Sequence, residues 1–216
     1  MGLPSGLLWA PMNIDAQQER GFAESPFQYD CSFVSWGNVD PHSPNNDNAS
    51  FDYNWGGINA QAPWYEGQVY GSTPGSELKT DLDIAHDIAN LICGEKWRMP
   101  SSNEFKELID YCDFIQADGT TVIDAGTTDK RVTVNGVLGI YLKSKINGNL
   151  LFFACSGYGH GTSWSSRGSI GYYWSASYSF SKGAYSLDFN SNRVDPHVAI
   201  KRYFGCPVRP VYDPSL

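Results

Sequence analysis

The fold class of this chain follows from one stretch, Val132-Thr133-Val134-Asn135-Gly136-Val137-Leu138-Gly139-Ile140-Tyr141-Leu142. Two runs rich in β-branched residues flank Asn135-Gly136, the dipeptide most typical of a two-residue hairpin turn. The next run, residues 145–154, carries a second Asn-Gly pair at Asn147-Gly148. Two consecutive hairpins predict an antiparallel meander in this part of the chain.

Two helices are predicted before the meander. An apolar stripe at helical spacing starts from Asp81 and ends at Gly94, which stands where a helix C-cap belongs. After Pro100, Ser101 and Glu104 form a capping-box pattern that opens a second helix. The apolar positions are Leu82, Ala85, Ile88, Ala89 and Ile92 in the first helix and Phe105, Leu108, Ile109 and Cys112 in the second. Helices early and strands late, without βαβ alternation, predict an α+β fold with a mostly antiparallel sheet, two helices and long loops.

The remaining segments complete a single domain over residues 1–216. Residues 3–10 and 31–37 are predicted to be short strands. Residues 40–78 form an insertion rich in Asn, Gly, Pro and aromatic residues. Because structureless loops of this length are uncommon, a packed insertion is favoured over a mobile lid. Its candidate aromatic anchors are Trp55, Trp64, Tyr65 and Tyr70. We expect this domain to be the C-terminal part of a longer protein.

The charge of the chain argues against several functions. The formal net charge is −8, which disfavours binding to nucleic-acid phosphates. Residues 156–206 carry a local excess of +3, from Arg167, Lys182, Arg193, Lys201 and Arg202 against Asp188 and Asp195. A basic binding face and a chance excess on an acidic scaffold both remain open. The sequence has no signal peptide and no apolar run long enough to span a bilayer, so no membrane insertion is expected.

No metal site and no cofactor are predicted. The five Cys residues lack C-x-x-C pairing, which argues against a disulfide framework and a structural zinc site. They are Cys31, Cys93, Cys112, Cys155 and Cys206. The His residues share no metal-ligand spacing; they are His42, a solvated His86, His160, which is a candidate ligand contact, and His197. The oxygen ligands at Asn45, Asn46, Asp47, Asn48 and Asp52 lack the Gly and bidentate Glu that shape a calcium loop.

The C-terminal quarter of the chain has the composition of a binding surface. Residues 156–206 contain eleven Ser, seven Gly and six Tyr, with Trp and Phe between them. Tyr and Trp give large contact areas with few rotatable bonds, while Ser, Gly and Asn give adaptable hydrogen bonds. The alternative is the Gly- and Ser-rich end of an ordinary β domain, which composition alone does not exclude.

Residues 168–206 also contain no Glu, Gln or Met. An Asn codon whose adenines are randomised yields Tyr, Ser, Phe, Asp, His, Val, Ala, Ile, Arg, Gly, Cys or Asn, but never Glu, Gln, Met, Lys or Trp. The run 195–200 mixes polar, charged and aliphatic residues without helical or strand periodicity. Lys182 and Lys201 do not fit the codon pattern. The segment otherwise has the character of independent residue choices on a fixed scaffold.

Six sequence segments, which together extend from Gly2 to Val211, resemble those of a known protein family. Three are C-terminal: Gly171-Tyr172-Tyr173-Trp174-Ser175-Ala176-Ser177, Ala184-Tyr185-Ser186-Leu187-Asp188-Phe189-Asn190-Ser191 and Arg202-Tyr203-Phe204-Gly205-Cys206-Pro207-Val208-Arg209-Pro210-Val211. Three lie upstream: Gly2-Leu3-Pro4-Ser5-Gly6-Leu7-Leu8-Trp9-Ala10, Phe33-Val34-Ser35-Trp36-Gly37 and Trp97-Arg98-Met99-Pro100-Ser101. Together they resemble the C-type-lectin-fold variable proteins of diversity-generating retroelements, which occur in gut bacteria and their phages. The resemblance implies a C-type lectin fold.

The resemblance also implies a function. The expected protein is a non-enzymatic binding domain that recognises a host-cell surface protein or glycan. It is expected on the virion, at the tip of a phage tail fibre, with a possible homotrimeric arrangement. A bacterial surface adhesin of the same fold without diversification is the first alternative. The second is an enzyme similar to the formylglycine-generating oxidases, although Cys155 and Cys206 lack the spacing of their reactive pair. The Glu-Pro-Asn and Gln-Pro-Asp triplets of sugar-binding C-type lectins are absent, so calcium-dependent sugar binding is not expected.

The resemblance further divides the C-terminal residues into two sets. The implied framework is Trp174, Leu187, Phe189, Gly205, Val208 and Arg209. The implied ligand-facing set, exchangeable between variants, is Tyr178, Ser179, Phe180, Tyr185, Ser186, Asp188, Asn190, Asn192, Arg193, Asp195, His197, Val198, Ala199, Ile200, Tyr203 and Phe204. Tyr178, Phe180, Tyr185, His197, Ile200 and Tyr203 are predicted to form one exposed patch. Separately, Arg98 and Arg209 are each expected to be buried beside a carboxylate.

Overall fold

The computed structural model describes residues 1–37, 39, 41, 81–160, 163–180, 183–202 and 204–216, without the side chains of His160 and Phe180. Its helices are the 3-10 helix η1 (Ile84–His86), α1 (Ile88–Cys93) and α2 (Ser102–Asp110). Its strands are β1 (Leu8–Trp9), β2 (Phe33–Val34), β3 (Trp97–Arg98), β4 (Cys112–Phe114), β5 (Arg131–Val134), β6 (Val137–Ser144), β7 (Leu150–Ala154), β8 (Tyr158–His160), β9 (Ser163–Ser165), β10 (Gly171–Phe180), β11 (Gly183–Phe189), β12 (Val194–Lys201), β13 (Cys206–Pro207) and β14 (Val211–Tyr212). All described strand ladders are antiparallel, so the protein has the α+β class predicted from the sequence.

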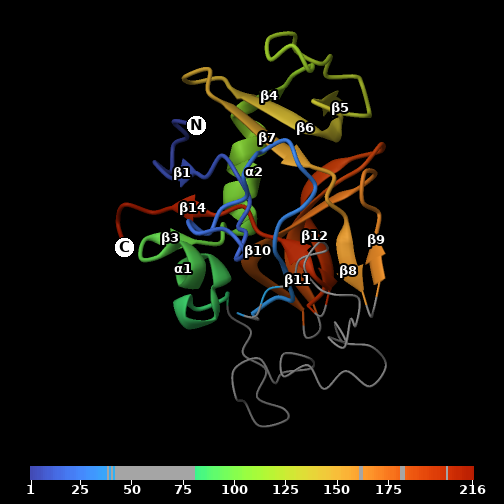
Figure 1. Ribbon diagram of the computed structural model, residues 1–216. Helices are drawn as coiled ribbons and strands as arrows, with labels where there is room; N and C mark the ends of the chain where they lie inside the picture. The colour runs from blue at the N-terminus through green and yellow to red at the C-terminus, as the bar shows by residue number, and fades with distance from the viewer. Residues whose placement is uncertain (38, 40, 42–80, 161–162, 181–182, 203) are drawn as a thin grey trace.

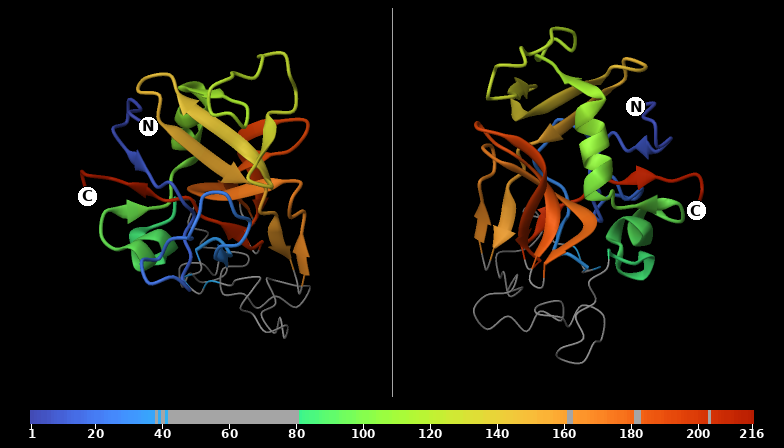
Figure 2. Two further views of the ribbon diagram at one scale, coloured as in Figure 1. Left: turned by 45° about the horizontal axis from the view of Figure 1, so that its top comes forward. Right: turned by 180° about the vertical axis from the view of Figure 1, so that it is seen from behind.

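The strands form small sheets around one helix. The order β10-β11-β12 makes the sheet that carries the C-terminal segment, and β4, β5 and β7 assemble around β6. Near the chain ends, β14 lies between β1 and β3, so both termini lie on the same side of the molecule (Figure 1). Seen from behind, α2 runs alongside the β10-β11-β12 sheet (Figure 2).

The predicted meander is confirmed. Strands β5, β6 and β7 follow one another as antiparallel neighbours. The turn between β5 and β6 places Asn135 at φ 50° and Gly136 at φ 81°. Both residues are therefore in the left-handed region, as a two-residue type I′ turn requires. The second Asn-Gly pair turns the chain back between β6 and β7, with Gly148 at φ 73°.

The first predicted helix is wrong in its extent. Instead of one helix from Asp81 to Gly94, η1 and α1 are separated by Asp87. The Asp87 side chain is buried and accepts the N–H groups of Ala89 at 2.9 Å and Met99 at 2.7 Å. Asp87 thereby caps α1 and fixes it to the backbone just after β3, and the chain is not helical at Asp87 itself. Ala85, assigned to the apolar stripe, is consequently exposed.

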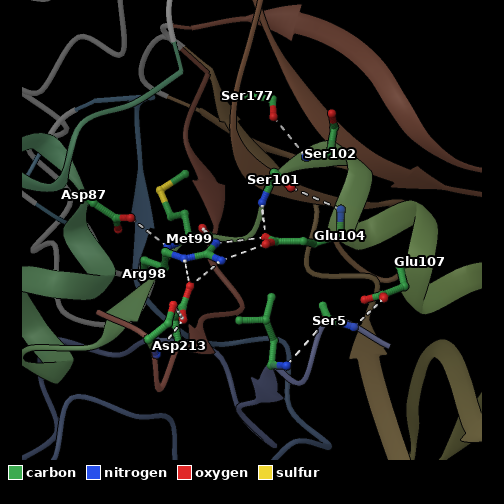
Figure 3. A network of polar contacts seen from close by, with 12 residues as sticks. Ser5, Asp87, Arg98, Met99, Ser101, Ser102, Glu104, Glu107, Ser177 and Asp213 are labelled. Atoms are coloured by element: carbon green, nitrogen blue, oxygen red, sulfur yellow. Dashed lines mark hydrogen bonds and ion pairs between the residues drawn. The ribbon is translucent and has the colours of Figure 1, made fainter. Parts of the chain in front are cut away.

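The second helix begins as predicted. Ser101 accepts the N–H of Glu104, and the Glu104 carboxylate accepts the N–H of Ser101, which completes the capping box. Glu104 also accepts two hydrogen bonds from Arg98, at 2.7 and 2.9 Å. The same Arg98 reaches Asp213 near the C-terminus, at 3.0 Å (Figure 3). One guanidinium thus connects β3, α2 and the end of the chain; Arg98 pairs with carboxylates as predicted, but it is partly rather than fully buried.

The two predicted N-terminal strands are shorter than expected, and most of the predicted insertion lies outside the described residues. Only residues 8–9 and 33–34 of the predicted strands 3–10 and 31–37 form ladders. The insertion 40–78 lies outside the described residues except for Pro41, as do its anchors Trp55, Trp64, Tyr65 and Tyr70. Among the described residues, no helix combines the length and apolar character needed to cross a membrane.

The core lies on both sides of β11. One cluster packs Leu187 and Phe189 of β11 against Phe105 and Leu108 of α2. A second cluster lies against the other face and joins Ala184 of β11 to tryptophans such as Trp174, with Trp36, Met99, Cys206 and Val208 around them. Both faces of this strand are therefore interior.

Replacing Phe189 with Ala should destabilise the domain by about 3–5 kcal/mol, because a fully buried ring packed over Gly171 is lost and a cavity remains. Asn192→Ser, at an exposed position, should cost about 0.5 kcal/mol or less. Denaturant titration of both variants measures the contrast. Equal losses would contradict the assignment of Phe189 to the core.

Asp87 should make stability depend on pH. Burial raises the pKa of Asp87 from 3.8 to about 6, despite its accepted N–H bonds. Because the folded state binds this proton more tightly, the contribution of Asp87 is greatest below pH 3.8 and is lost as the pH rises through 6. Asp87→Asn removes this titration. Unfolding free energies across that range should therefore fall with pH more steeply in the parent protein than in the variant; parallel curves would refute the assignment.

Candidate functional site

The framework set implied by the sequence is buried in the structure. Trp174, Leu187, Phe189 and Val208 have no exposed surface, and Arg209 is 1% exposed. Gly205 is also buried. The Trp174 indole N–H donates to the carbonyl of Val34 at 2.8 Å, so even its polar atom is satisfied inside the protein. The burial of these residues is thus confirmed.

Most of the ligand-facing set reaches the surface, with two exceptions. The residues that are half-buried or exposed are Tyr178, Ser179, Tyr185, Asn190, Asn192, Arg193, Asp195, His197, Val198, Ala199, Ile200 and Phe204. Ser186 and Asp188 have no exposed surface, so the prediction that they face a ligand is wrong. Both belong to β11, whose two faces are covered. Tyr203 and the Phe180 side chain lie outside the described residues.

The predicted single patch is also wrong, because its described members lie on opposite faces of the sheet. Residues paired across neighbouring antiparallel strands share a face, and successive residues alternate. Tyr178 pairs with Ala184, and Ala184 pairs with Ile200. Tyr185 lies on the other face, where its ring meets that of His197 at 5.7 Å between centroids. His197 is within 3.4 Å of Asn103 on α2, which identifies this as the helix side of the sheet.

The run 195–200 forms most of β12, although its sequence has no strand periodicity. Strand β12 lies at one end of the three-stranded order and is half-buried from Val194 to Ile200. The register shifts between Ser186 and Asp188, next to Pro196. A proline is tolerated there because bulges and outer strands do not need every N–H for the ladder. Side chains on both faces of such a strand reach solvent in part, so alternation is absent.

The sheet face away from α2 carries an aromatic surface, defined here by Tyr158, Tyr172, Ile200 and Phe204. All four are partly buried against the second core cluster. The Tyr158 ring lies 5.2 Å from that of Tyr172 and 5.1 Å from that of Phe204, between centroids. Burial, helped by the nearby charge of Asp188, raises the pKa of Tyr172 to about 12, so its hydroxyl stays protonated. Tyr158 and Tyr172 were not in the predicted ligand-facing set. The sequence feature that could have identified them is their position between Gly and aromatic residues.

An ion pair between a buried carboxylate and a half-exposed guanidinium lies beside this surface. Tyr172 and Asp188 are register partners. The Asp188 carboxylate accepts hydrogen bonds from Arg193, including one from Nε at 3.1 Å, and lies 3.5 Å from the Asn190 amide. The Arg193 side chain itself is 50% exposed. An inward carboxylate thus holds an outward guanidinium at the edge of the aromatic surface.

Four of the five cysteines are buried, and two of the histidines, His86 and His197, have described side chains. All five cysteines are free. Burial raises the pKa of Cys155 to about 12 and that of Cys206 well above its usual range, which keeps both thiols in their less nucleophilic, protonated form. His86 lies 2.7 Å from Asp83, in a partly exposed pair. Within the described residues no cluster of three metal-binding side chains occurs. His42, Asp47 and Asp52 lie outside that description.

Arg209 does not pair with a carboxylate, contrary to the prediction. It is buried, but its hydrogen bonds go to the Asn13 side chain and to the carbonyls of Ala10, Pro11 and Phe152, rather than to a carboxylate. Its guanidinium also lies 4.6 Å from the centre of the Phe153 ring. Neutral acceptors compensate the charge only in part, and burial lowers the pKa of Arg209 to about 10.

Comparison with protein-family models, curated proteins and solved structures finds no match to this chain. The site is therefore defined by its own geometry: an aromatic surface and an anchored Arg193 on the sheet face opposite α2.

Arg193→Gln should destabilise the domain by about 2–4 kcal/mol, because it removes the cation from a carboxylate with no exposed surface. Lys106→Gln breaks a surface pair with Asp110 whose members are both half-exposed, and should cost about 0.5 kcal/mol or less. Chemical denaturation of the two variants provides the comparison. If Arg193→Gln were as mild as the control, Asp188 would have to be satisfied in another way.

Proposed function

We propose that this protein is a non-enzymatic receptor-binding domain with a C-type lectin fold, whose C-terminal sheet carries a diversified surface. Its target is a host-cell surface protein or glycan, contacted from the tip of a phage tail fibre, where three copies can assemble. The alternative version of this proposal is a bacterial surface adhesin of the same fold, which has the same binding role without diversification. Both versions use the same surface, so the binding experiments below apply to each.

The proposal is supported chiefly by one observation: the C-terminal segment separates into a buried set and a surface set. Within β10 to β13, residues such as Trp174 and Leu187 have no exposed surface, while neighbours such as His197 and Ile200 remain partly accessible. A scaffold of this kind allows surface residues to change while the core is kept. That is the property a diversified binding domain needs.

The composition of the accessible part also supports binding. Aromatic rings and an Arg are the residues that most often dominate binding energies at interfaces. Tyr158, Tyr172 and Phe204 place three such rings together, and Arg193 lies next to them with its guanidinium fixed by Asp188. Side chains already held in place lose less conformational freedom on binding. The aromatic surface is therefore the part of the sheet best suited to contact a receptor.

A cell-binding assay tests this function. A fluorescent fusion of the domain would be titrated onto a panel of gut bacterial isolates and onto their extracted outer-membrane proteins and glycans. Ile200→Glu should weaken binding to any positive isolate by about tenfold or more, because it places a charge on the aromatic surface. Leu91→Glu, at an exposed position of α1, is the control and should bind as the parent does. Circular dichroism shows whether the Ile200→Glu variant is folded. If that variant does not fold, the milder Phe204→Ala provides a second test. Binding unaffected by both folded variants would place recognition elsewhere.

The source DNA separates diversification from a fixed adhesin. A diversified gene should lie near a reverse-transcriptase gene and a near-duplicate of the codons for residues 168–206, with differences confined to adenines of the template. Sequencing the flanking locus checks this directly. Absence of such a repeat from the complete source genome would leave the adhesin as the form of the proposed function.

A further inference from the structure

A hollow lies at the far end of the molecule from the aromatic surface. Its volume is about 330 Å³, which falls in the range of small-molecule sites. The lining residues come from the end of α2, from β4, from the loop that follows it and from the turn after β6; they are Ile109, Cys112, Asp113, Phe114, Val122, Ile123, Ala125, Lys130 and Lys145. Strand β4 lies at the upper end of the molecule in Figure 1, whereas β11 and β12 lie in its lower half.

The inner lining of this hollow is apolar. Ile109 and Phe114 pack against the main core cluster, and Ile123 is buried in the neighbouring one. Val122 lines the same hollow yet is 52% exposed, which is a large fraction for an aliphatic side chain in a folded domain. An apolar ligand segment laid against Val122 would remove this surface from water.

Two ammonium groups border the apolar lining. Lys130 Nζ donates to the carbonyls of Asp124 and Ala125, at 2.7 and 3.2 Å, and lies 5.9 Å from the centre of the Phe114 ring. No described carboxylate lies within ion-pair distance of Lys130. Lys145 Nζ donates to the carbonyl of Asp110 at 2.9 Å, and its distance to the Asp113 carboxylate is 3.8 Å.

The charge at this site favours a monoanion. The chain carries a net charge of −8, yet the hollow is lined by two lysines and one carboxylate, Asp113. An ammonium has three N–H donors. Lys130 uses two on carbonyl oxygens and Lys145 uses one on a carbonyl at short range. Donor capacity therefore remains for one anionic head group.

From this arrangement we infer that the hollow binds a small amphiphile with a single carboxylate, of the medium-chain fatty-acid class. The apolar tail lies against Ile109, Phe114, Val122 and Ile123, and the carboxylate accepts hydrogen bonds from Lys130 and Lys145. This site is independent of the proposed receptor-binding function, because none of its lining residues belongs to the β10-β11-β12 sheet.

Calorimetric titration with decanoate, below the concentration at which it forms micelles, tests the inference. Saturable binding with one site per chain is expected. Lys130→Gln and Lys145→Gln should each weaken it by about fivefold or more, because each removes a charged donor. Lys143→Gln, a neighbouring lysine outside the lining, should leave the affinity unchanged. Decanol, which has the same tail without the charge, should bind at least about tenfold more weakly.

Two further measurements keep the outcome clear. Val122→Asp should abolish decanoate binding while the circular dichroism spectrum is retained. This variant tests the site even if Lys130→Gln loosens the loop whose carbonyls Lys130 contacts. Vesicles containing phosphatidylglycerol test a membrane surface instead of a free amphiphile. Decanoate binding that is absent, that is equally weakened by Lys143→Gln, or that is matched by decanol would overturn the inference. Vesicle binding in place of decanoate binding would overturn it as well.

Discussion

The burial of β11 on both faces is the constraint on which the rest of this structure depends. A strand with one solvated face can vary along that face, but β11 sends Leu187 and Phe189 into one core and Ala184 and Ser186 into another. The layers on each side follow from this. Helix α2 covers one face, and the aromatic residues around Trp174 cover the other. The accessible positions of the β10-β11-β12 sheet therefore lie mostly in β10, in β12 and in the turn before β12, and Tyr185 is the one partly exposed residue of β11.

Several polar groups inside this double core are satisfied by nearby carbonyl oxygens. Ser186 donates to the carbonyl of Val198 at 3.0 Å, and Ser175 donates to that of Tyr185 at 2.7 Å. Arg209 is surrounded by carbonyl oxygens and an amide. Since a buried polar atom without a partner costs free energy, these contacts tie the sheet to specific neighbours rather than to apolar surface in general. Together with Arg98, they connect segments that are distant in sequence.

Local signals in the sequence predicted much of the fold, and long-range contacts explain what it missed. The Asn-Gly turns and the capping box at Ser101 depend on a few adjacent residues, so they could be read directly. The break at Asp87 could not be predicted in this way, because it involves a hydrogen bond from the N–H of Met99, which lies just after β3. The two-sided burial of β11 likewise hides the alternation by which buried and exposed positions are usually told apart. The family resemblance assigned Ser186 and Asp188 to the surface, and the local sequence offered no alternation that would have corrected this or separated the two faces of the sheet.

The pairing of Asp188 with Arg193 limits how freely this surface can evolve. Asp188 has no exposed surface, while Arg193 comes from the turn before β12 and faces solvent. We therefore expect the two positions to be coupled, so that a change at one is tolerated only with certain residues at the other. A repertoire generated by independent substitution would contain many members with an uncompensated charge in the interior. Such a repertoire would therefore contain fewer folded variants than the number of residue combinations.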